Sequence, residues 1–176
     1  AHRLSTIRNA DVILVIKDGD IKNQLIGEVH PLVIAEEIKN HVDSEDVVLE
    51  CACGTGLLTV PMAEKCSKLI ATDYSDGMLK QTEKKVAQYN NTELKKVSIL
   101  ELPFDDASFD VVVAGNVIHL LPDPQSALEE LARVCKDGGK LIIPTYINGD
   151  EGTNKLAVKF LEKLGASFKR QFDAES

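Results

Sequence analysis

The sequence lacks several features that would define a class of protein at once. It has no tryptophan, aromatic residues make up only 5% of its 176 residues, and 20 lysines and arginines face 28 aspartates and glutamates. The net charge of −8 disfavours a nucleic-acid surface, because binding to phosphates needs clustered basic side chains. No apolar run approaches the roughly 20 residues that cross a bilayer, and no signal peptide is evident. We therefore expect a soluble, cytoplasmic protein that binds neither nucleic acid nor membrane.

Metal-binding and phosphate-binding motifs are also missing. The four cysteines form no CxxC pair and have no histidine at ligand spacing, which favours reduced thiols and no metal site. No GxxxxGK[ST] loop is present, so nothing would cradle the phosphates of ATP and ATP hydrolysis is not expected. The length and the hydrophobic content of 44% suit a single compact domain.

Apolar, β-branched runs alternate with amphipathic stretches along most of the chain. The pattern predicts strands over 46–51, 68–73, 96–101, 109–115 and 140–146. It predicts helices over 25–42 (with a kink at Pro31), 57–66, 76–90, 125–135 and 154–164. This alternation is typical of an α/β protein with a Rossmann-like fold, in which a doubly wound, mostly parallel sheet carries helices on both faces.

Two helices carry start signals. Ser75 is expected to cap the helix over 76–90, and Asp123 followed by Pro124 is expected to open the helix over 125–135. The apolar residues available for the inner face of the first of these helices are Met78, Leu79, Val86 and Tyr89.

The strand over 46–51 runs directly into a glycine-containing loop, Glu50-Cys51-Ala52-Cys53-Gly54-Thr55-Gly56. Glycines between a strand and a helix let the backbone come close to a ligand. Asp73 ends the next predicted strand, where its carboxylate can accept hydrogen bonds from the hydroxyls of a ribose. Loop and aspartate together predict a ligand that contains a nucleoside.

Residues 24–166 resemble the class I S-adenosylmethionine-dependent methyltransferases. Four segments carry the resemblance in the family's order and spacing, at 48–56, 71–79, 102–110 and 133–141. The resemblance implies S-adenosylmethionine as the cofactor and the transfer of its methyl group to a small-molecule acceptor.

The resemblance also implies where the cofactor lies. The backbone around Ala52, Gly54 and Gly56 would pass beneath its methionine portion, with Glu50 near the amino group and Asn116 beside the same portion.

The remaining assignments concern the other end of the cofactor and the acceptor. Asp73 would hold both ribose hydroxyls and Tyr74 would border the adenine. His119 would face the acceptor pocket and act as general base if the acceptor must lose a proton, since the pKa of histidine lies near neutrality.

Each of these residues has a structural alternative. Gly54 and Gly56 could simply permit a tight turn, and Asp73 could cap a helix or lie on the surface. Tyr74 could be a packing residue, and His119 could be a hydrogen-bonded core histidine.

The chain departs from the family pattern at three places. Ala52 stands where the family usually has glycine. The strand predicted over 96–101 runs straight into Leu102, which would shorten the segment whose acidic residue holds the adenine and leave Glu101 as its replacement. Only residues 165–176 follow the last predicted helix, too few for the antiparallel hairpin that completes the family's sheet.

Residues 1–21 follow another pattern, because they closely resemble the stretch of ABC transporter nucleotide-binding domains that starts at the switch histidine, here His2. The apolar run 12–16 followed by Lys17-Asp18-Gly19-Asp20 predicts a β-hairpin. A join near residues 21–23 indicates a chimera, engineered or arising from a gene fusion, of segments 1–22 and 23–176 within one compact domain. We hypothesise that the hairpin lies beside the strand over 140–146 and covers an open sheet edge; the alternative is a floppy extension.

Two functions remain open at this point. The first is a methyltransferase that uses S-adenosylmethionine. The second is a non-catalytic chimera that keeps the scaffold with little or no cofactor affinity. A monomer and a homodimer are both compatible with the sequence, because a second subunit could also close the sheet edge.

Overall fold

The computed structural model describes residues 10–17, 20–27 and 31–147, and side chains within 31–144 except that of His119. Within these residues seven strands form one sheet in the order β2-β1-β7-β6-β3-β4-β5. The strands are β1 (Ala10–Lys17), β2 (Asp20–Gly27), β3 (Val47–Cys51), β4 (Lys68–Asp73), β5 (Thr92–Lys96), β6 (Phe109–Ala114) and β7 (Cys135–Ile147). The helices are α1 (Pro31–Asn40), α2 (Thr59–Ala63), α3 (Asp76–Val86), the 3₁₀ turn η2 (Ile118–Leu120) and α4 (Pro124–Val134).

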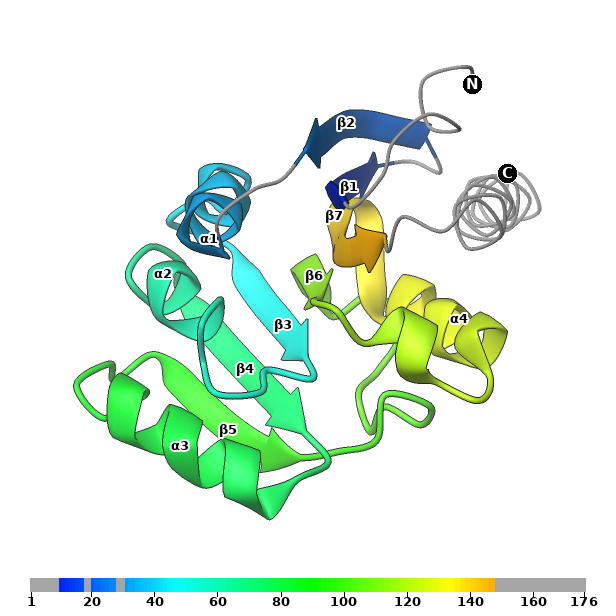
Figure 1. Ribbon diagram of the computed structural model, residues 1–176. Helices are drawn as coiled ribbons and strands as arrows, with labels where there is room; N and C mark the ends of the chain where they lie inside the picture. Colours follow the sequence, from blue (N-terminus) through cyan, green and yellow to red (C-terminus); the bar gives the residue numbers. More distant parts are fainter. Residues whose placement is uncertain (1–9, 18–19, 28–30, 148–176) are drawn as a thin grey trace.

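The five strands from β3 to β7 are mutually parallel where they pair. β3 pairs with β4 and β6, β4 with β5, and β6 with β7. The predicted doubly wound, Rossmann-like sheet is thus confirmed, and the strand over 68–73 has the predicted bounds. Figure 1 shows α1, α2 and α3 on one side of this sheet and α4 on the other.

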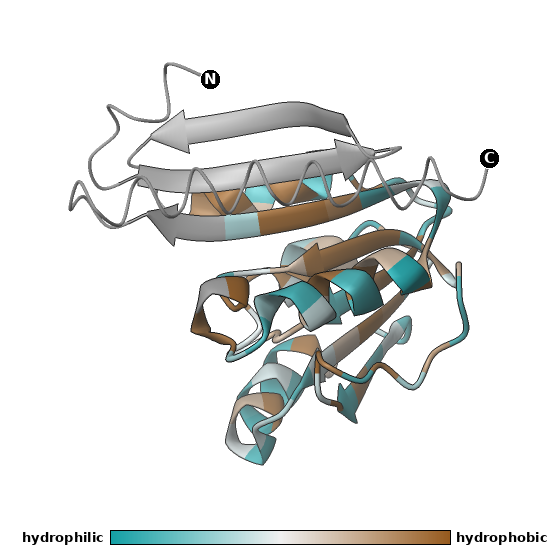
Figure 2. Cartoon of the chain, turned by 90° about the vertical axis from the view of Figure 1, so that its right-hand side faces the viewer, coloured by the Kyte–Doolittle hydropathy of each residue, from teal (hydrophilic) through white to brown (hydrophobic). Residues whose placement is uncertain are grey.

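Successive side chains of β3 point to opposite faces of the sheet, so the core consists of two layers. Val48 packs with residues of α1 and α2, whereas Leu49 and Cys51 belong to the layer covered by α4. Figure 2 shows hydrophobic residues along the strands and hydrophilic residues over much of the helix surface. Burial of one leucine or isoleucine side chain stabilises the fold by about 1.5–3 kcal/mol, so the two layers together supply the main stabilising term.

Both predicted helix starts are confirmed. The Ser75 hydroxyl accepts a hydrogen bond from the Met78 N–H, and the Asp123 carboxylate accepts one from the Ser126 N–H at 3.1 Å. The inner face of α3 agrees with the prediction in part, because Val86 is buried and Tyr89 packs against the core. Met78 is exposed, and Thr82 and Val86 are the buried residues of this helix.

Other predicted boundaries were wrong. Residues 25–27 belong to β2 because they pair with β1, and Pro31 begins α1 instead of kinking a longer helix. The strand predicted over 96–101 is β5, which spans 92–96. Residues 97–101 therefore lie in the connection that follows it. β7 begins at Cys135 and passes through an irregularity near Gly138, whose φ is +72°. The helix expected over 154–164 lies outside the described residues.

The N-terminal hairpin joins the sheet as hypothesised. β1 pairs antiparallel with β2 and with β7, in a register that runs from Ala10 opposite Ile147 to Ile16 opposite Leu141. β1 therefore covers the edge of β7 that would otherwise be open. β2 continues through the proposed join at residues 21–23 as far as Gly27, so the hairpin spans both segments.

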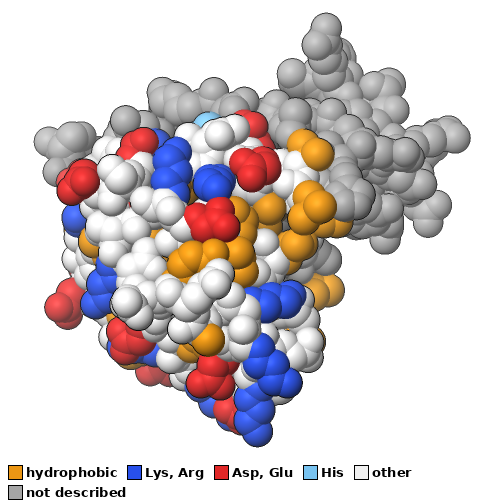
Figure 3. Space-filling view, turned by 90° about the vertical axis from the view of Figure 1, so that its left-hand side faces the viewer, with side chains coloured by type: hydrophobic (Ala, Val, Ile, Leu, Met, Phe, Trp, Pro, Cys, Tyr) orange, Lys and Arg blue, Asp and Glu red, His pale blue; other side chains and the backbone are white. Residues whose placement is uncertain are grey.

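On the face shown in Figure 3, basic and acidic side chains are interspersed. The ion pairs of the described residues include Lys39 with Glu64 and Lys96 with Asp76, each at 2.6 Å. None of the helices in the described part of the chain is long and apolar enough to cross a membrane.

Candidate functional site

A cavity of about 260 Å³ lies at the carboxyl ends of β3 and β6. The chain runs from β3 outward to β4 and β5 in one direction and from β6 to β7 in the other, so β3 and β6 flank a topological switch point, the usual place for a ligand in an open α/β sheet. The lining residues come from α1, from the end of β3 and its loop, and from the ends of β6 and β7: Pro31, Ile34, Glu50, Ala52, Cys53, Gly54, Thr55, Leu57, Leu58, Gly115, Asn116 and Pro144.

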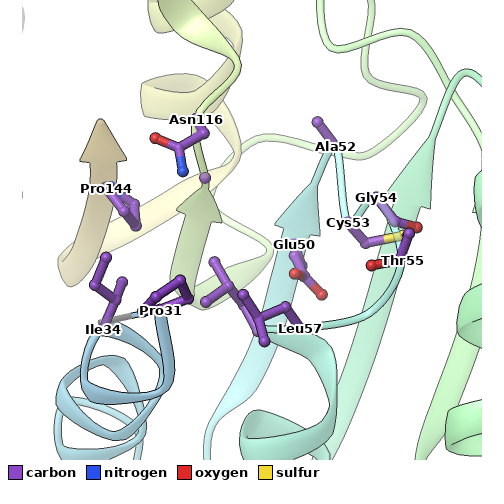
Figure 4. Close-up of a pocket in the computed structure, with 12 residues that line it drawn as sticks. Pro31, Ile34, Glu50, Ala52, Cys53, Gly54, Thr55, Leu57, Asn116 and Pro144 are labelled. Atoms are coloured by element: carbon purple, nitrogen blue, oxygen red, sulfur yellow. The ribbon is translucent and has the colours of Figure 1, made fainter. Parts of the chain in front are cut away.

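The structure brings four of the predicted site residues to this cavity, namely Glu50, Ala52, Gly54 and Asn116. In Figure 4 the apolar side chains of Pro31, Ile34 and Pro144 lie on one side of Glu50, and the Ala52–Thr55 loop lies on the other. Four further predicted residues, Gly56, Asp73, Tyr74 and Glu101, do not line the cavity. The side chain of His119 lies outside the described part of the structure; its backbone belongs to η2.

Glu50 is the buried charged group of the cavity. Its side chain is 1% exposed, and its Oε2 accepts a hydrogen bond of 2.6 Å from the Thr59 hydroxyl. Burial raises the pKa of this carboxyl to about 7, and the nearby Asp73 charge adds to the effect while Thr59 opposes it. Among the described residues no hydrogen-bond donor reaches Oε1 of Glu50.

The loop after β3 has a backbone that few residue types adopt. Ala52, Gly54 and Gly56 have φ of +57°, +56° and +83°, and Asn116 across the cavity has +52°. Asparagine tolerates this left-handed conformation, but alanine is strained there by about 1–2 kcal/mol. The positive φ of Ala52 explains why glycine is usual at its position.

The Gly54 peptide is held from two sides. Its N–H donates to Oδ2 of Asp73 at 2.9 Å, and its carbonyl accepts from the Thr82 hydroxyl at 2.8 Å. Thr82 also lies beneath Gly56, where a Cβ would meet its side chain at 3.1 Å. The sequence reasoning missed both threonines, Thr59 and Thr82, because neither belongs to a recognised motif.

Asp73 is neither the helix cap nor the surface acid considered as alternatives, because Ser75 caps α3 and Asp73 is half-buried. Its Oδ1 also accepts a hydrogen bond from the Ser75 N–H at 2.8 Å. Each carboxylate oxygen has two lone pairs, so these two bonds leave acceptor capacity for ribose hydroxyls. Tyr74 is 75% exposed, and its ring lies 5.9 Å from the Lys96 ammonium group. The alternative of Tyr74 as a buried packing residue is therefore wrong.

The expected shortening before Leu102 was also wrong. Because β5 ends at Lys96 and β6 begins at Phe109, residues 97–108 are available for the connection. The guanidinium group of Arg133 on α4 fixes this segment by donating to the carbonyls of Phe104 and Leu102 at 2.7 and 2.9 Å. Glu101, the expected replacement for the acid that holds the adenine, is exposed and does not line the cavity.

The cysteine beside the cavity is not an activated nucleophile. Cys53 lines the cavity, and burial raises the pKa of its thiol to about 12, so the neutral form predominates near pH 7. All four cysteines are buried thiols. No cluster of three potential metal ligands occurs in the described residues.

Comparison with known proteins gives a consistent result. A family model described as "Methyltransferase domain" matches residues 49–143. A demethylmenaquinone methyltransferase of Lactobacillus johnsonii is 33% identical over 143 residues, which are 73% of this chain and 59% of that protein. A phosphatidylethanolamine N-methyltransferase of Cereibacter sphaeroides is 33% identical over 125 residues, 67% of this chain and 61% of the relative.

Solved structures show the same likeness. A SAM-dependent methyltransferase from Aquifex aeolicus is 25% identical with a TM-score of 0.56, covering 64% of this chain and 62% of its own. A SAM-dependent methyltransferase from Thermotoga maritima is 28% identical with a TM-score of 0.54, covering 64% and 50%. The chain thus spans about three fifths of the two relatives named above. These comparisons lend no support to the resemblance of residues 1–21 to ABC transporter domains, which stays a prediction.

Proposed function

The chain belongs to the methyltransferase-domain family, and on this premise we propose that it transfers a methyl group from S-adenosylmethionine, the cofactor of the family, to a small-molecule acceptor. The observation that carries the proposal is the buried Glu50 carboxylate in a cavity at the switch point of the sheet, with one oxygen held by Thr59 and the other without a donor among the described residues.

The residues present fit a part of the cofactor. At about 260 Å³ the cavity is smaller than the roughly 300–1,000 Å³ of pockets that enclose a whole drug-sized ligand, which suits the amino-acid portion. Glu50 would pair with the cofactor's ammonium group, since a buried carboxylate is stabilised by an opposite charge. Asp73 would hold the ribose through its remaining lone pairs, and the exposed ring of Tyr74 would border the adenine.

The bound cofactor supplies an activated methyl group on a sulfonium. The protein's part in such a transfer is to orient the reactants and to exclude water. The apolar wall of Pro31, Ile34, Leu57, Leu58 and Pro144 supports the second role. Asn116 would lie beside the methionine portion, and His119 would take a proton from an acceptor that must lose one.

The two relatives named above are described as acting on demethylmenaquinone and on phosphatidylethanolamine. We therefore place the acceptor among small molecules with an apolar part.

The rival function, a scaffold with little cofactor affinity, rested on two expectations. One was a shortened segment before Leu102, and the other was an incomplete sheet. In the structure residues 97–108 provide the segment between β5 and β6, and β1 and β2 occupy the edge of the sheet. We propose that this hairpin, whatever its origin, completes the sheet at the edge of β7.

A turnover assay tests the proposal. The protein is incubated with S-adenosylmethionine and a panel of quinols, phenols and amine-bearing lipids, and S-adenosylhomocysteine is quantified. We expect formation of S-adenosylhomocysteine that depends on one acceptor class. A folded protein that neither binds S-adenosylhomocysteine nor produces it with any acceptor would support the rival function.

A further inference from the structure

The Glu50 carboxylate has few polar neighbours. In the sheet Glu50 stands opposite Ala71 of β4 and Val113 of β6, and neither side chain can donate a hydrogen bond. The titratable group that acts on it is Asp73, at the end of β4, whereas Glu50 itself acts on the thiols of Cys51 and Cys53. Burial raises the pKa of both thiols to about 12, so they stay neutral. The Thr59 hydroxyl is the single hydrogen-bond donor to the carboxylate within the described residues.

Thr59 is well suited to fix the orientation of this carboxylate. It is the first residue of α2, its side chain is 0% exposed, and its Oγ1 lies 2.6 Å from Oε2 of Glu50. A threonine side chain in a helix is limited to two main χ1 rotamers, so its hydroxyl has few alternative positions. Since a carboxylate is planar, holding Oε2 also determines where Oε1 lies.

We propose that Thr59 is a positioning residue for cofactor binding, whose hydroxyl holds the Glu50 carboxylate so that Oε1 remains available to the cofactor's ammonium group. The inference rests on the proposed function. It gives α2 a role in cofactor binding, namely the orientation of the Glu50 carboxylate, that the glycine loop alone does not have.

The hydrogen bond also acts on the charge of Glu50. A donor to the carboxylate favours its ionised form, and the Thr59 bond opposes the rise in pKa that burial causes. Without the hydroxyl the pKa of Glu50 would rise further above 7. More of the protein would then hold a neutral Glu50 at pH 7, which cannot form an ion pair with an ammonium group.

A pH series of calorimetric titrations with S-adenosylhomocysteine tests this role. The variants are Thr59→Val, which keeps the shape and lacks the hydroxyl, and Thr59→Ser, which keeps the hydroxyl. Thr72→Val is the matched control, because Thr72 is also buried (1% exposed) but donates to the backbone carbonyl of Glu50 at 3.1 Å instead of to its carboxylate.

We expect the affinity of the wild type to rise with pH through an inflection near pH 7 and to level off above it, where Glu50 is ionised. Thr59→Val should move this inflection upward by about one pH unit and weaken binding about tenfold at pH 7. Thr59→Ser should keep the wild-type inflection. Thr72→Val should lower thermal stability and leave the inflection in place. The titration of the ligand itself is common to all four proteins and cancels in the comparison.

An inflection in Thr59→Val that matches the wild type would overturn the proposal, and so would an equal shift in Thr72→Val. If Thr59→Val does not fold, Thr59→Ala replaces it, and a shift in Thr59→Ser as large as that in Thr59→Ala would contradict the role of the hydroxyl. Failure of the proposed function is distinguishable, because the wild type itself would then not bind S-adenosylhomocysteine at any pH.

Discussion

The carboxylate of Asp73 at the end of β4 accepts a hydrogen bond from the backbone N–H of Gly54, with 2.9 Å between Oδ2 and N. This bond connects the end of β4 to the loop that follows the neighbouring parallel strand β3. Because Oδ1 accepts from Ser75, the same side chain also helps to start α3. Asp73 thus shapes the glycine loop as well as offering acceptors to a ligand.

The dual role of Asp73 sets up the first prediction. Asp73→Ala should weaken the binding of S-adenosylhomocysteine by about tenfold to a hundredfold, because two charge-assisted hydrogen bonds to the ribose are lost. Loosening of the Gly54 loop would weaken binding too. The two causes are separated with the 2′,3′-dideoxy analogue of the ligand in a double cycle.

If Asp73 bonds the ribose, removal of both hydroxyls costs affinity in the wild type and almost none in Asp73→Ala. An equal loss in both proteins would assign Asp73 to loop structure alone. Calorimetric titration of each protein with each ligand provides the four affinities.

Ala52 leads to a prediction about stability. Its φ of +57° is strained for alanine by about 1–2 kcal/mol, whereas glycine adopts it freely but loses about 0.5–1 kcal/mol of additional backbone entropy on folding. Ala52→Gly should therefore stabilise the protein by up to about 1 kcal/mol. Ala71→Gly, in the buried centre of β4, is the control and should destabilise it. Urea denaturation measures both, and destabilisation by Ala52→Gly would contradict the strained conformation.

Glu50 makes the stability of the protein depend on pH. Its pKa is 4.5 in the unfolded chain and about 7 in the folded protein, so the folded state holds the extra proton between these values. The unfavourable contribution is absent below pH 4.5, grows as the pH rises, and is complete above pH 7, where it amounts to about 3 kcal/mol. Glu50→Gln removes it and retains an oxygen that can accept from Thr59.

The measured quantity is the difference in unfolding free energy between Glu50→Gln and the wild type, at pH 5 and at pH 8. We expect Glu50→Gln to gain stability relative to the wild type as the pH rises through this range. A difference that does not change with pH would show that Glu50 ionises as a solvent-exposed carboxyl.

The strands could be predicted where both faces of the sheet are covered. β4 and β6 consist of continuous apolar runs with buried residues such as Leu69, Val112 and Val113, which is the pattern of a central parallel strand. β5 has the sequence Thr-Glu-Leu-Lys-Lys at the edge of the sheet, where the pattern is weak. The strand was predicted too far along the chain because Val97 and Ile99 are apolar. In the structure these two residues pack on the core from a loop.

The site could be predicted in part for a related reason. Glu50, Gly54 and Asn116 lie at or just after the ends of strands. The topology places these strand ends at one edge of the sheet. The roles of Thr59 and Thr82 depend on how α2 and α3 approach that edge. One signal for Thr82 was present: it stands three residues after Leu79 and four before Val86, so it is a polar residue on the inner face of α3.

The hairpin at the N-terminus gives a further prediction. β1 lies between β2 and β7, with Leu14 opposite Gln24 and Ile143. Proline has no N–H for the ladder and is excluded from central strands, so Leu14→Pro should leave a carbonyl of the neighbouring strand without its donor and destabilise the protein by about 1–3 kcal/mol. Hydrogen exchange should also accelerate at the β7 amides that pair with β1. Unchanged stability and protection would show that the hairpin is not part of the folded sheet.

The central claim is that the cavity beside Glu50 binds the amino-acid portion of S-adenosylmethionine. The most direct measurement is calorimetric titration of the folded protein with S-adenosylhomocysteine at pH 7.5, in parallel with Glu50→Gln. We predict saturable binding of one ligand per chain, weakened at least about tenfold in Glu50→Gln because the ion pair with the ammonium group is lost. Absence of binding up to millimolar ligand, or equal affinity of the two proteins, would contradict the account.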